Sequence, residues 1–250
     1  MDSVATESFV FIFAIAAFFA SFQIKLLLQA KKRADLIRET PTTPVGKLCE
    51  GYFEAKGKVA EIEDADLLIS PLTKKKCVYY NLELLKLQSA HTGSSRVQAW
   101  SHIIDDSDFI VFTLTDGTGD IYVDVGGAEM NLKPDKELES GGAWTDPPAE
   151  LEEYLKTRNM TAKCLSGSLN YICRETVLEP QDTLYVLGSV IRDDDKELTF
   201  FQSDELYYIS DTDENSLLDK LDKQIFRHFL HTAVIFCGAF ILYTAVMFGR

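Results

Sequence analysis

The sequence has few basic residues for its length of 250. It contains 25 Lys and Arg against 39 Asp and Glu, which gives a formal net charge of -14. A surface with this negative balance repels nucleic acid and anionic lipid at long range. We therefore expect no nucleic-acid partner.

Cysteine is scarce and unsuitably spaced for metal or disulfide chemistry. The count of five is odd, and no two cysteines stand at a metal-ligand spacing. We expect no disulfide framework, which fits a reducing compartment. The five residues are Cys49, Cys77, Cys164, Cys173 and Cys237.

Recognisable catalytic motifs are also missing. The sequence has no G-x-S-x-G, no Cys with a nearby His, and no acid pair in a sugar-cleaving context. Because catalytic triads assemble in space rather than in sequence, this absence lowers the expectation of an enzyme without excluding one. We predict no catalytic, cofactor-binding or metal-binding residue, and no cofactor.

Two apolar segments stand near the ends of the chain, at 8–28 and 229–248. Each has about the 20 residues that a helix needs to cross a bilayer. A cleaved signal peptide is an alternative for the first segment, but such peptides begin with a basic region and this chain begins "MDSVATE". A buried hairpin of core helices is the alternative for the pair. We predict two transmembrane helices.

Basic residues flank both segments on the side of the chain's middle. Lys31, Lys32, Arg33 and Arg38 follow the first segment, and Lys220, Lys223 and Arg227 precede the second. Because Lys and Arg favour cytoplasmic flanks, the middle is predicted on the cytoplasmic side and both termini on the opposite side. The same residues suit contact with lipid headgroups, so the bilayer is an expected partner.

The middle of the chain has mostly the period-two pattern of β-strands. After a tether at 29–56, broken by Pro41 and Pro44, residues 57–210 contain nine short runs rich in Val, Ile, Tyr and Phe. They predict an antiparallel sandwich or partly open barrel, since the helices that parallel strands need as crossovers are missing.

Two helices are expected around these strands. "DPPAELEEYLKTRN" has Asp146 as a plausible N-cap, and residues 211–228 are expected to run as a helix into the second apolar segment. The predicted fold class is a membrane-anchored, mostly β α+β chain with one inserted helix, flanked by N- and C-terminal transmembrane helices.

Two loops resemble ligand-binding motifs. Asp211 to Asp222 places oxygen side chains like a calcium loop, but Ser216 stands where the sharp turn needs Gly. A helix with a capping box formed by Ser216 and Asp219 fits better. "TDGTGDIY" around Asp116 precedes a strand, whereas a phosphate-binding loop opens a helix, so it is interpreted as a hairpin turn.

The four histidines have no Cys or carboxylate partners at ligand spacing. They are His91, His102, His228 and His231. His228 and His231 lie three residues apart on one helix and could share a metal, but further ligands are lacking. We interpret that pair as part of a polar rim.

"SPLTKKKCVYYNLELLK", from Ser70 to Lys86, places Cys77 directly after three lysines. Positive charge favours the reactive thiolate. Strand alternation, however, puts Cys77 and Tyr79 on one face and Val78 and Tyr80 on the other. We interpret the stretch as a solvated turn followed by a core strand.

Four pieces of the sequence resemble one known family in order. They are "SPLTKKKCVYYNLEL", Trp100, "FTLTDGTGDIYVDVGGAE" and "RETVLEPQDTLYVLGSV". They are similar to the pattern of the GIDE, or Beside-A-Membrane, domain over about Gly57 to Val190. That domain is known from mitochondrial RING-type E3 ubiquitin and SUMO ligases and from prokaryotic proteins, and its two-helix layout resembles the layout expected here.

The resemblance has two departures. Gln181 stands where the family has Gly in "P-G-D", so this turn is expected to differ locally. The ligases carry a zinc-binding RING finger beyond the second helix, whereas this sequence stops at Arg250, so their activity is not carried over. The resemblance would suggest an E3 ligase, but we expect no enzyme.

We expect an interaction or regulatory module with a protein partner. One alternative is an accessory or substrate-recognition subunit of a ubiquitin-like ligase system whose catalytic chain is separate. A sensor for lipid or a small ligand at the membrane surface is the other.

Overall fold

The computed structural model describes residues 3–92, 95–139, 147–160, 171–192, 197–212 and 214–248. The chain divides into two compact units. One unit joins the two ends, Met1–Pro41 and Asp213–Arg250, and the other is Thr42–Thr212. Each is described by itself.

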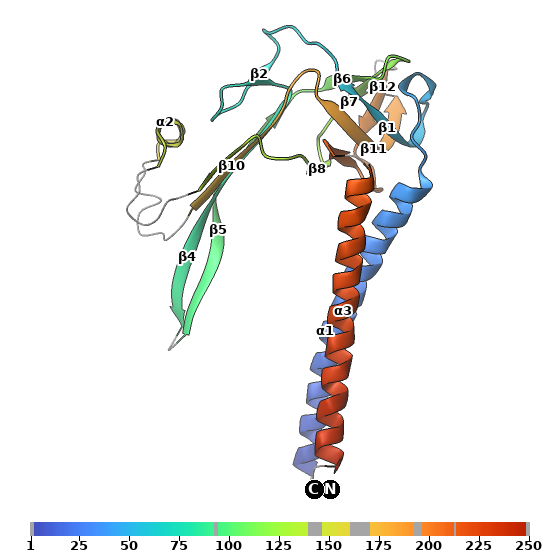
Figure 1. The fold of residues 1–250 in the computed structure, drawn as a ribbon, viewed down its shortest axis with the longest axis vertical. Helices are drawn as coiled ribbons and strands as arrows, with labels where there is room; N and C mark the ends of the chain where they lie inside the picture. Colours follow the sequence, from blue (N-terminus) through green and yellow to red (C-terminus); the bar gives the residue numbers. More distant parts are fainter. Residues whose placement is uncertain are drawn as a thin grey trace. The chain divides into compact units, whose positions relative to one another are not determined.

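The first unit consists of helices α1 (Ser3–Glu39) and α3 (Glu214–Phe248), which run antiparallel (Figure 1). Small buried residues such as Ala30 and Ala34 allow the helices to approach closely. Arg38 donates to both carboxylate oxygens of Asp222, at 2.7 and 2.8 Å. Large apolar side chains remain exposed on both helices, among them Phe18, Phe22, Phe226, Phe229 and Phe236.

The predicted transmembrane helices at 8–28 and 229–248 are corrected by the structure. Among the described residues, no helix is both long enough and apolar enough to cross a bilayer. Polar side chains also meet between the two helices, where Gln23 Oε1 of α1 lies 2.8 Å from His228 Nδ1 of α3. The predicted membrane anchoring is therefore also wrong. So is the predicted placement of the middle and the termini on opposite sides of a membrane.

Two helix boundaries follow the sequence prediction. The first helix ends at Glu39, just before Pro41, and α3 is continuous from Glu214 to Phe248. Ser216 is therefore inside the first turn of α3, so its predicted role as the N-cap of a capping box is wrong.

The second unit is built around a closed five-stranded barrel. Its strands, in order around the barrel, are β1 (Gly51–Val59), β6 (Phe112–Thr115), β7 (Asp120–Val123), β12 (Leu198–Phe201) and β11 (Thr183–Arg192), which pairs back with β1. The strand order continues from β11 to β13 (Tyr208–Ser210) and β8 (Glu129–Asn131). The protein is mostly β, but the barrel is closed rather than partly open.

Strand β1 closes the barrel by pairing with two strands, β11 and β6. Residues 51–58 pair with β11, and Lys58 and Val59 pair with β6. Gly57 precedes Lys58, which pairs with both strands, and a Cβ added at Gly57 would stand 2.7 Å from the carbonyl oxygen of Thr115. Only glycine allows this approach. Strand β1 also begins at Gly51, inside the segment assigned to the tether.

Two pairings in this unit are parallel, contrary to the all-antiparallel prediction. They join β12 to β7 and β13 to β8. Parallel neighbouring strands need a long crossover connection, and the prediction assumed that helices would supply it. Here the chain between β7 and β12 instead builds β10, α2 and β11, so a folded insertion supplies the crossover.

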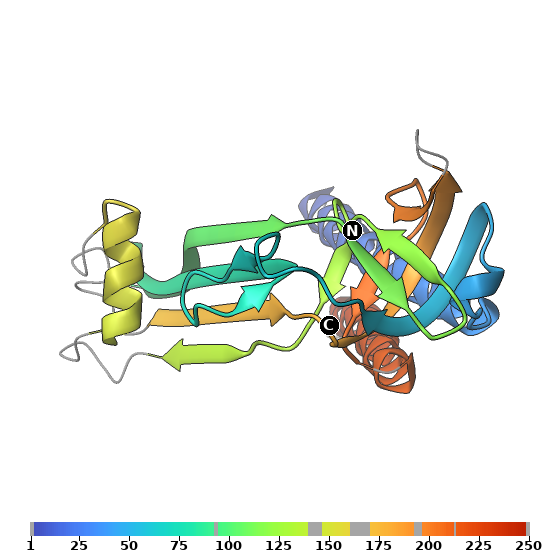
Figure 2. The same cartoon turned by 90° about the horizontal axis from the view of Figure 1, so that it is seen from above.

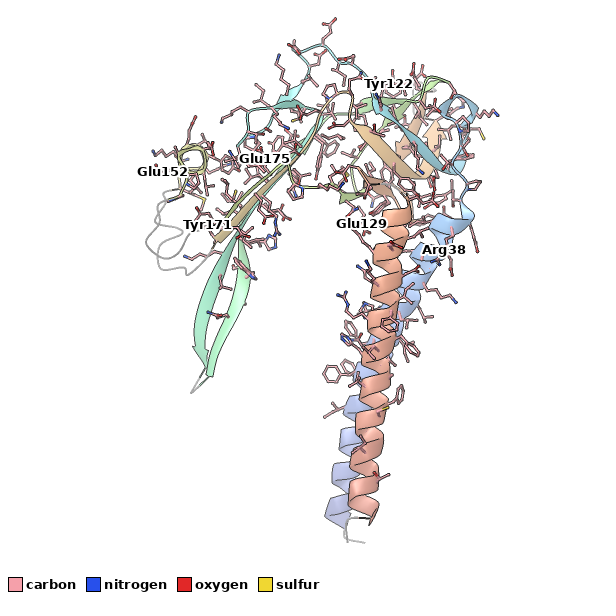
Figure 3. The ribbon with its side chains drawn as sticks, viewed as in Figure 1. Arg38, Tyr122, Glu129, Glu152, Tyr171 and Glu175 are labelled. Carbon is pink, nitrogen blue, oxygen red and sulfur yellow. The ribbon has the colours of Figure 1, made fainter. Side chains whose placement is uncertain are left out.

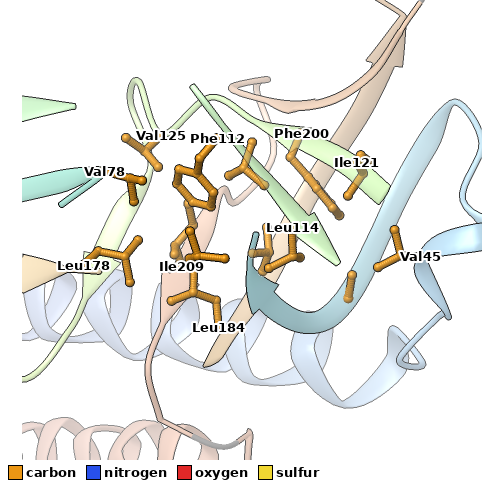
Figure 4. Close-up of a cluster of buried hydrophobic side chains, with 14 of the residues drawn as sticks. Val45, Val78, Phe112, Leu114, Ile121, Val125, Leu178, Leu184, Phe200 and Ile209 are labelled. Atoms are coloured by element: carbon orange, nitrogen blue, oxygen red, sulfur yellow. The ribbon is translucent and has the colours of Figure 1, made fainter. Parts of the chain in front are cut away.

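The barrel is filled by large side chains that alternate along its strands (Figure 4). Phe112 lies opposite Val123, and Phe200 is the neighbour of both Val123 and Val190. All four are at most 1% exposed. A barrel of so few strands has room for side chains rather than for a ligand, so a binding site must use its outside.

A four-stranded sheet makes up the rest of the second unit. Its order is β5 (Ser95–Phe109), β4 (Tyr79–Thr92), β10 (Tyr171–Leu178) and β9 (Lys136–Glu139), and a short pair, β2 (Leu68–Ile69) and β3 (Lys76–Cys77), precedes it. The inserted helix α2 (Ala149–Thr157) lies near this sheet (Figure 2). It packs Leu151 and Leu155 against Leu82 and Leu84.

The inserted helix is confirmed, but its predicted cap is wrong. The N-cap is Pro148, and Asp146 lies outside the described residues. Tyr154 of α2 donates its hydroxyl to Asp106 Oδ2 of β5 at 2.6 Å, and Arg158 bonds the same oxygen. Burial acts to raise the pKa of Asp106, but these two hydrogen bonds outweigh it and lower that pKa.

Gln181 keeps the turn that glycine makes in the related pattern. Its φ is 73°, in the left-handed region, and its N–H donates to the Val59 carbonyl at 2.9 Å. The expected local difference is therefore a side chain held in a conformation that glycine adopts more easily.

A buried carboxylate holds the turn at 71–73, which precedes β3. Glu175 of β10 is fully buried (Figure 3). Its Oε1 accepts the N–H of Leu72 at 2.6 Å, and its Oε2 accepts the N–H and hydroxyl of Thr73 at 2.8 and 2.5 Å. These bonds replace the water that a buried charge loses.

We expect Glu175→Ala to lower the free energy of unfolding by about 2–4 kcal/mol, because the buried N–H of Leu72 and the part-buried N–H of Thr73 lose their acceptor. Chemical denaturation followed by circular dichroism measures this loss. The matched control is Glu61→Ala, an exposed Glu whose removal should change stability by about 0.5 kcal/mol or less. Equal effects of the two substitutions would contradict the anchoring role of Glu175.

Candidate interaction site on the barrel surface

Cys77 is a buried core residue. Burial, followed by the nearby carboxylates of Glu175 and Glu179, raises the pKa of the Cys77 thiol to about 11. The thiol is thus protonated at neutral pH. A bend at Val78 separates β3 from β4, and Cys77, Val78 and Tyr79 are all buried. The predicted alternation fails here because the bend at Val78 interrupts the strand.

Two of the three lysines before Cys77 are partnered by carboxylates. Lys75 Nζ bonds Asp135 Oδ1 at 2.9 Å and Glu179 Oε1 at 2.6 Å. Lys76 pairs with Asp64, and Lys74 is exposed. The positive charge that could have activated the thiol is therefore taken up by acids, and the interpretation as a turn leading into the core is confirmed.

The remaining sequence candidates do not converge on one another. Asp116 lies in the confirmed β6–β7 hairpin turn, where its carboxylate accepts hydrogen bonds from Thr118 and from the N–H of Val45. The hydrogen bond from the Thr118 side chain lowers the pKa of Asp116 more than its other contacts do. The segment from Asp211 to Asp222 is helical from Glu214 onward, which does not leave a calcium loop.

The histidines and cysteines are dispersed. His102 is exposed on β5, and the rings of His228 and His231 are 6.5 Å apart on α3. The side chain of His91 and all of Cys164 lie outside the described residues. In the parts of the chain that the structure describes, no group of three His, Cys, Asp or Glu could hold a metal ion.

A different site lies on the outside of the barrel. Thr113 of β6 is opposite Tyr122 of β7, Tyr122 is beside Thr199 of β12, and Thr199 is opposite Ile191 of β11. Their inward neighbours Phe112, Val123, Phe200 and Val190 fill the core, so these four side chains form one row across the outer face. Figure 3 shows Tyr122 on this part of the molecule.

Two adjoining hollows, here together called the barrel groove, lie along this row. One has a volume of about 370 Å³ and the other of about 340 Å³, and both are lined by Tyr122 and Glu197. The larger hollow has apolar walls from Val111, Ile191 and Phe201, which are 51%, 40% and 41% exposed. Apolar side chains left this exposed and adjacent are typical of interaction surfaces.

Thr199 is the unusual polar residue of the larger hollow. Its residue is 7% exposed, and its hydroxyl has no hydrogen-bond partner among the described residues. Most buried polar side chains are hydrogen-bonded, because an unpaired hydroxyl costs about 1–3 kcal/mol. A ligand group that entered the hollow and bonded Thr199 would recover that cost.

The groove carries more negative than positive charge. Asp120, Asp124 and Glu197 line it together with one base, Arg192. Arg192 Nε lies 3.3 Å from Glu50 Oε1, so its charge is already partly compensated. The groove therefore suits a positively charged ligand better than a negative one.

Sequence reasoning missed this site. Its residues lie in or beside strands and are up to 90 positions apart, from Val111 to Phe201, and each looks like an ordinary residue of a β-rich chain. The parallel pairing of β7 with β12, which the sequence pattern does not reveal, is what brings Tyr122 beside Thr199.

The family of the chain follows from a family model that matches residues 83–245, more than half of its length. The chain belongs to the GIDE family. The model is described as E3 ubiquitin ligase. Comparison with curated proteins finds no match. The family resemblance drawn from the sequence is thereby confirmed, and every residue of the barrel groove lies inside the matched range.

We expect the buried thiols of this GIDE protein to resist alkylation in the folded state. Cys173 resembles Cys77, since burial raises its pKa to about 12. Iodoacetamide at pH 8, read by peptide mass spectrometry, should label the exposed Cys49 at least tenfold faster than either buried thiol. Unfolding in denaturant is the control and should equalise the rates. Rapid labelling of Cys77 in the folded chain would contradict its assignment to the core.

Proposed function

We propose that this GIDE protein is a non-catalytic protein-interaction module, and that a partner protein docks on the barrel groove. The observation that carries the proposal is the groove itself. It combines exposed apolar walls with a buried hydroxyl that has no partner among the described residues. Such a surface gains stability when a partner covers it.

The contacts of the reactive side chains support a non-catalytic role. Glu175 uses both carboxylate oxygens to hold a turn, and Glu54 accepts the hydroxyls of Thr42 and Tyr185. The Cys77 and Cys173 thiols have raised pKa values and are fully buried. These groups serve the fold, whereas a nucleophile or general base needs access to a substrate.

The matched family favours a second candidate function, an accessory or substrate-recognition subunit of a ubiquitin-like ligase system. The description of the family model as E3 ubiquitin ligase is the specific observation in its favour. Both candidates require the same event, the binding of another protein. They differ in whether that protein is then modified by a separate catalytic chain.

We expect a photocrosslinking amino acid at Tyr122, and separately at Phe201, to capture the same protein when the full chain is expressed in its native cells. The matched control site is Lys58, an exposed residue of β1 outside the groove. The captured protein, once purified, should bind the full chain and lose at least tenfold in affinity for Phe201→Asp. Equal capture at all three positions, or none, would overturn the proposal.

The second candidate is tested by reconstitution of ubiquitin-like transfer to the captured protein. A separate ligase chain and its conjugating enzyme are supplied, and the rate is measured with and without this GIDE protein. We expect the wild-type chain to raise the rate at least threefold and Phe201→Asp to remove the increase. An unchanged rate would reject the accessory function and leave the docking proposal in place.

A further inference from the structure

The chemistry of the barrel groove narrows the kind of partner segment that it takes. A ligand must satisfy three features at once. They are the unpaired hydroxyl of Thr199, the apolar walls of the larger hollow, and the surrounding carboxylates. Each of these features selects a different part of a side chain.

The hydroxyl and the acids select a cationic donor. Thr199 Oγ1 can accept a hydrogen bond, and the carboxylates of Asp124 and Glu197 line the same hollow. An ammonium or guanidinium group that reaches Thr199 would thus also come close to negative charge. Tyr122, 42% exposed, adds an aromatic face that attracts cations.

The walls select an aliphatic stem. Val111, Ile191 and Phe201 leave apolar surface at the entrance of the hollow. A small cation alone would leave this surface uncovered, whereas Lys and Arg have methylene chains that pack on apolar surface while the charged head remains with its polar partners. The hollow therefore matches both ends of such a side chain.

We propose that the barrel groove binds a lysine or arginine side chain from a basic segment of the partner protein, with its head at Thr199, Asp124 and Glu197 and its stem on Val111, Ile191 and Phe201. This inference rests on the proposed docking function and deepens it by assigning the chemistry of the partner. The net charge of -14 favours the approach of such a basic segment at long range.

The probe is a capped pentapeptide, acetyl-Gly-Leu-Lys-Leu-Gly-amide, titrated into the full chain labelled with ¹⁵N. We expect the backbone amide resonances of Tyr122, Ile191 and Thr199 to shift. The same peptide with Arg in place of Lys should cause similar shifts. Replacement of the Lys by Nε-acetyl-lysine or norleucine should weaken binding at least tenfold, because the first loses the charge and the second loses the donor. Raising the salt concentration from 50 to 500 mM should also weaken binding.

Substitutions of the groove separate recognition from folding. Thr199→Val keeps the shape and removes the unpaired hydroxyl, so we expect an unchanged or higher melting temperature together with at least fivefold weaker peptide binding. A purely structural hydroxyl would instead give a lower melting temperature. The double variant Asp124→Asn and Glu197→Gln should weaken binding at least tenfold, while the control Glu61→Gln should leave it unchanged.

The outcomes distinguish this inference from the docking proposal on which it rests. Equal binding of the acetyl-lysine and lysine peptides, or no binding of any peptide while Tyr122 still captures a protein, would overturn the cationic assignment alone. Spermidine that binds as tightly as the peptide would also overturn it, since a free cation lacks a partner segment. Loss of position-specific capture would remove both proposals.

Discussion

The pairing of β1 with two strands at once is the constraint on which the second unit depends. This strand pairs with β11 over residues 51–58 and with β6 at Lys58 and Val59, so it joins two strands that lie far apart in the sequence. The ring of hydrogen bonds closes only because the backbones of β1 and β6 approach without an intervening Cβ. The filled core, the outer row and the groove all follow from this closure.

Closure also separates the two faces of each barrel strand. Phe112, Val123, Val190 and Phe200 fill an interior with no space for a ligand, so the outward residues between them are the ones available for binding. Thr199 belongs to that outward set but is covered by its neighbours, which leaves a polar atom at the base of an apolar hollow. The site therefore lies on the outer face, where the Thr199 hydroxyl has no hydrogen-bond partner among the described residues, and not in the packed interior.

Local patterns in the sequence predicted local structure well. The β6–β7 hairpin turn, the inserted helix and the end of the first helix before Pro41 depend on residues close together in the chain, and all are confirmed. The predicted capping residues Asp146 and Ser216 were wrong because the helices begin at other positions. The predicted membrane spans were wrong, since no helix among the described residues is both long enough and apolar enough to cross a bilayer.

Long-range features could not be predicted from the same patterns. Alternation failed at Cys77 because a bend at Val78 interrupts the strand, and nothing in the local sequence showed that β7 would pair with β12. Thr199 and Tyr122 come together only through this parallel pair, across the chain that builds β9 and β10 of the four-stranded sheet. A nascent chain that ends at Arg192 already has β6, β7 and β11 but lacks Thr199 and Phe201, so the groove is completed only when synthesis has passed β12.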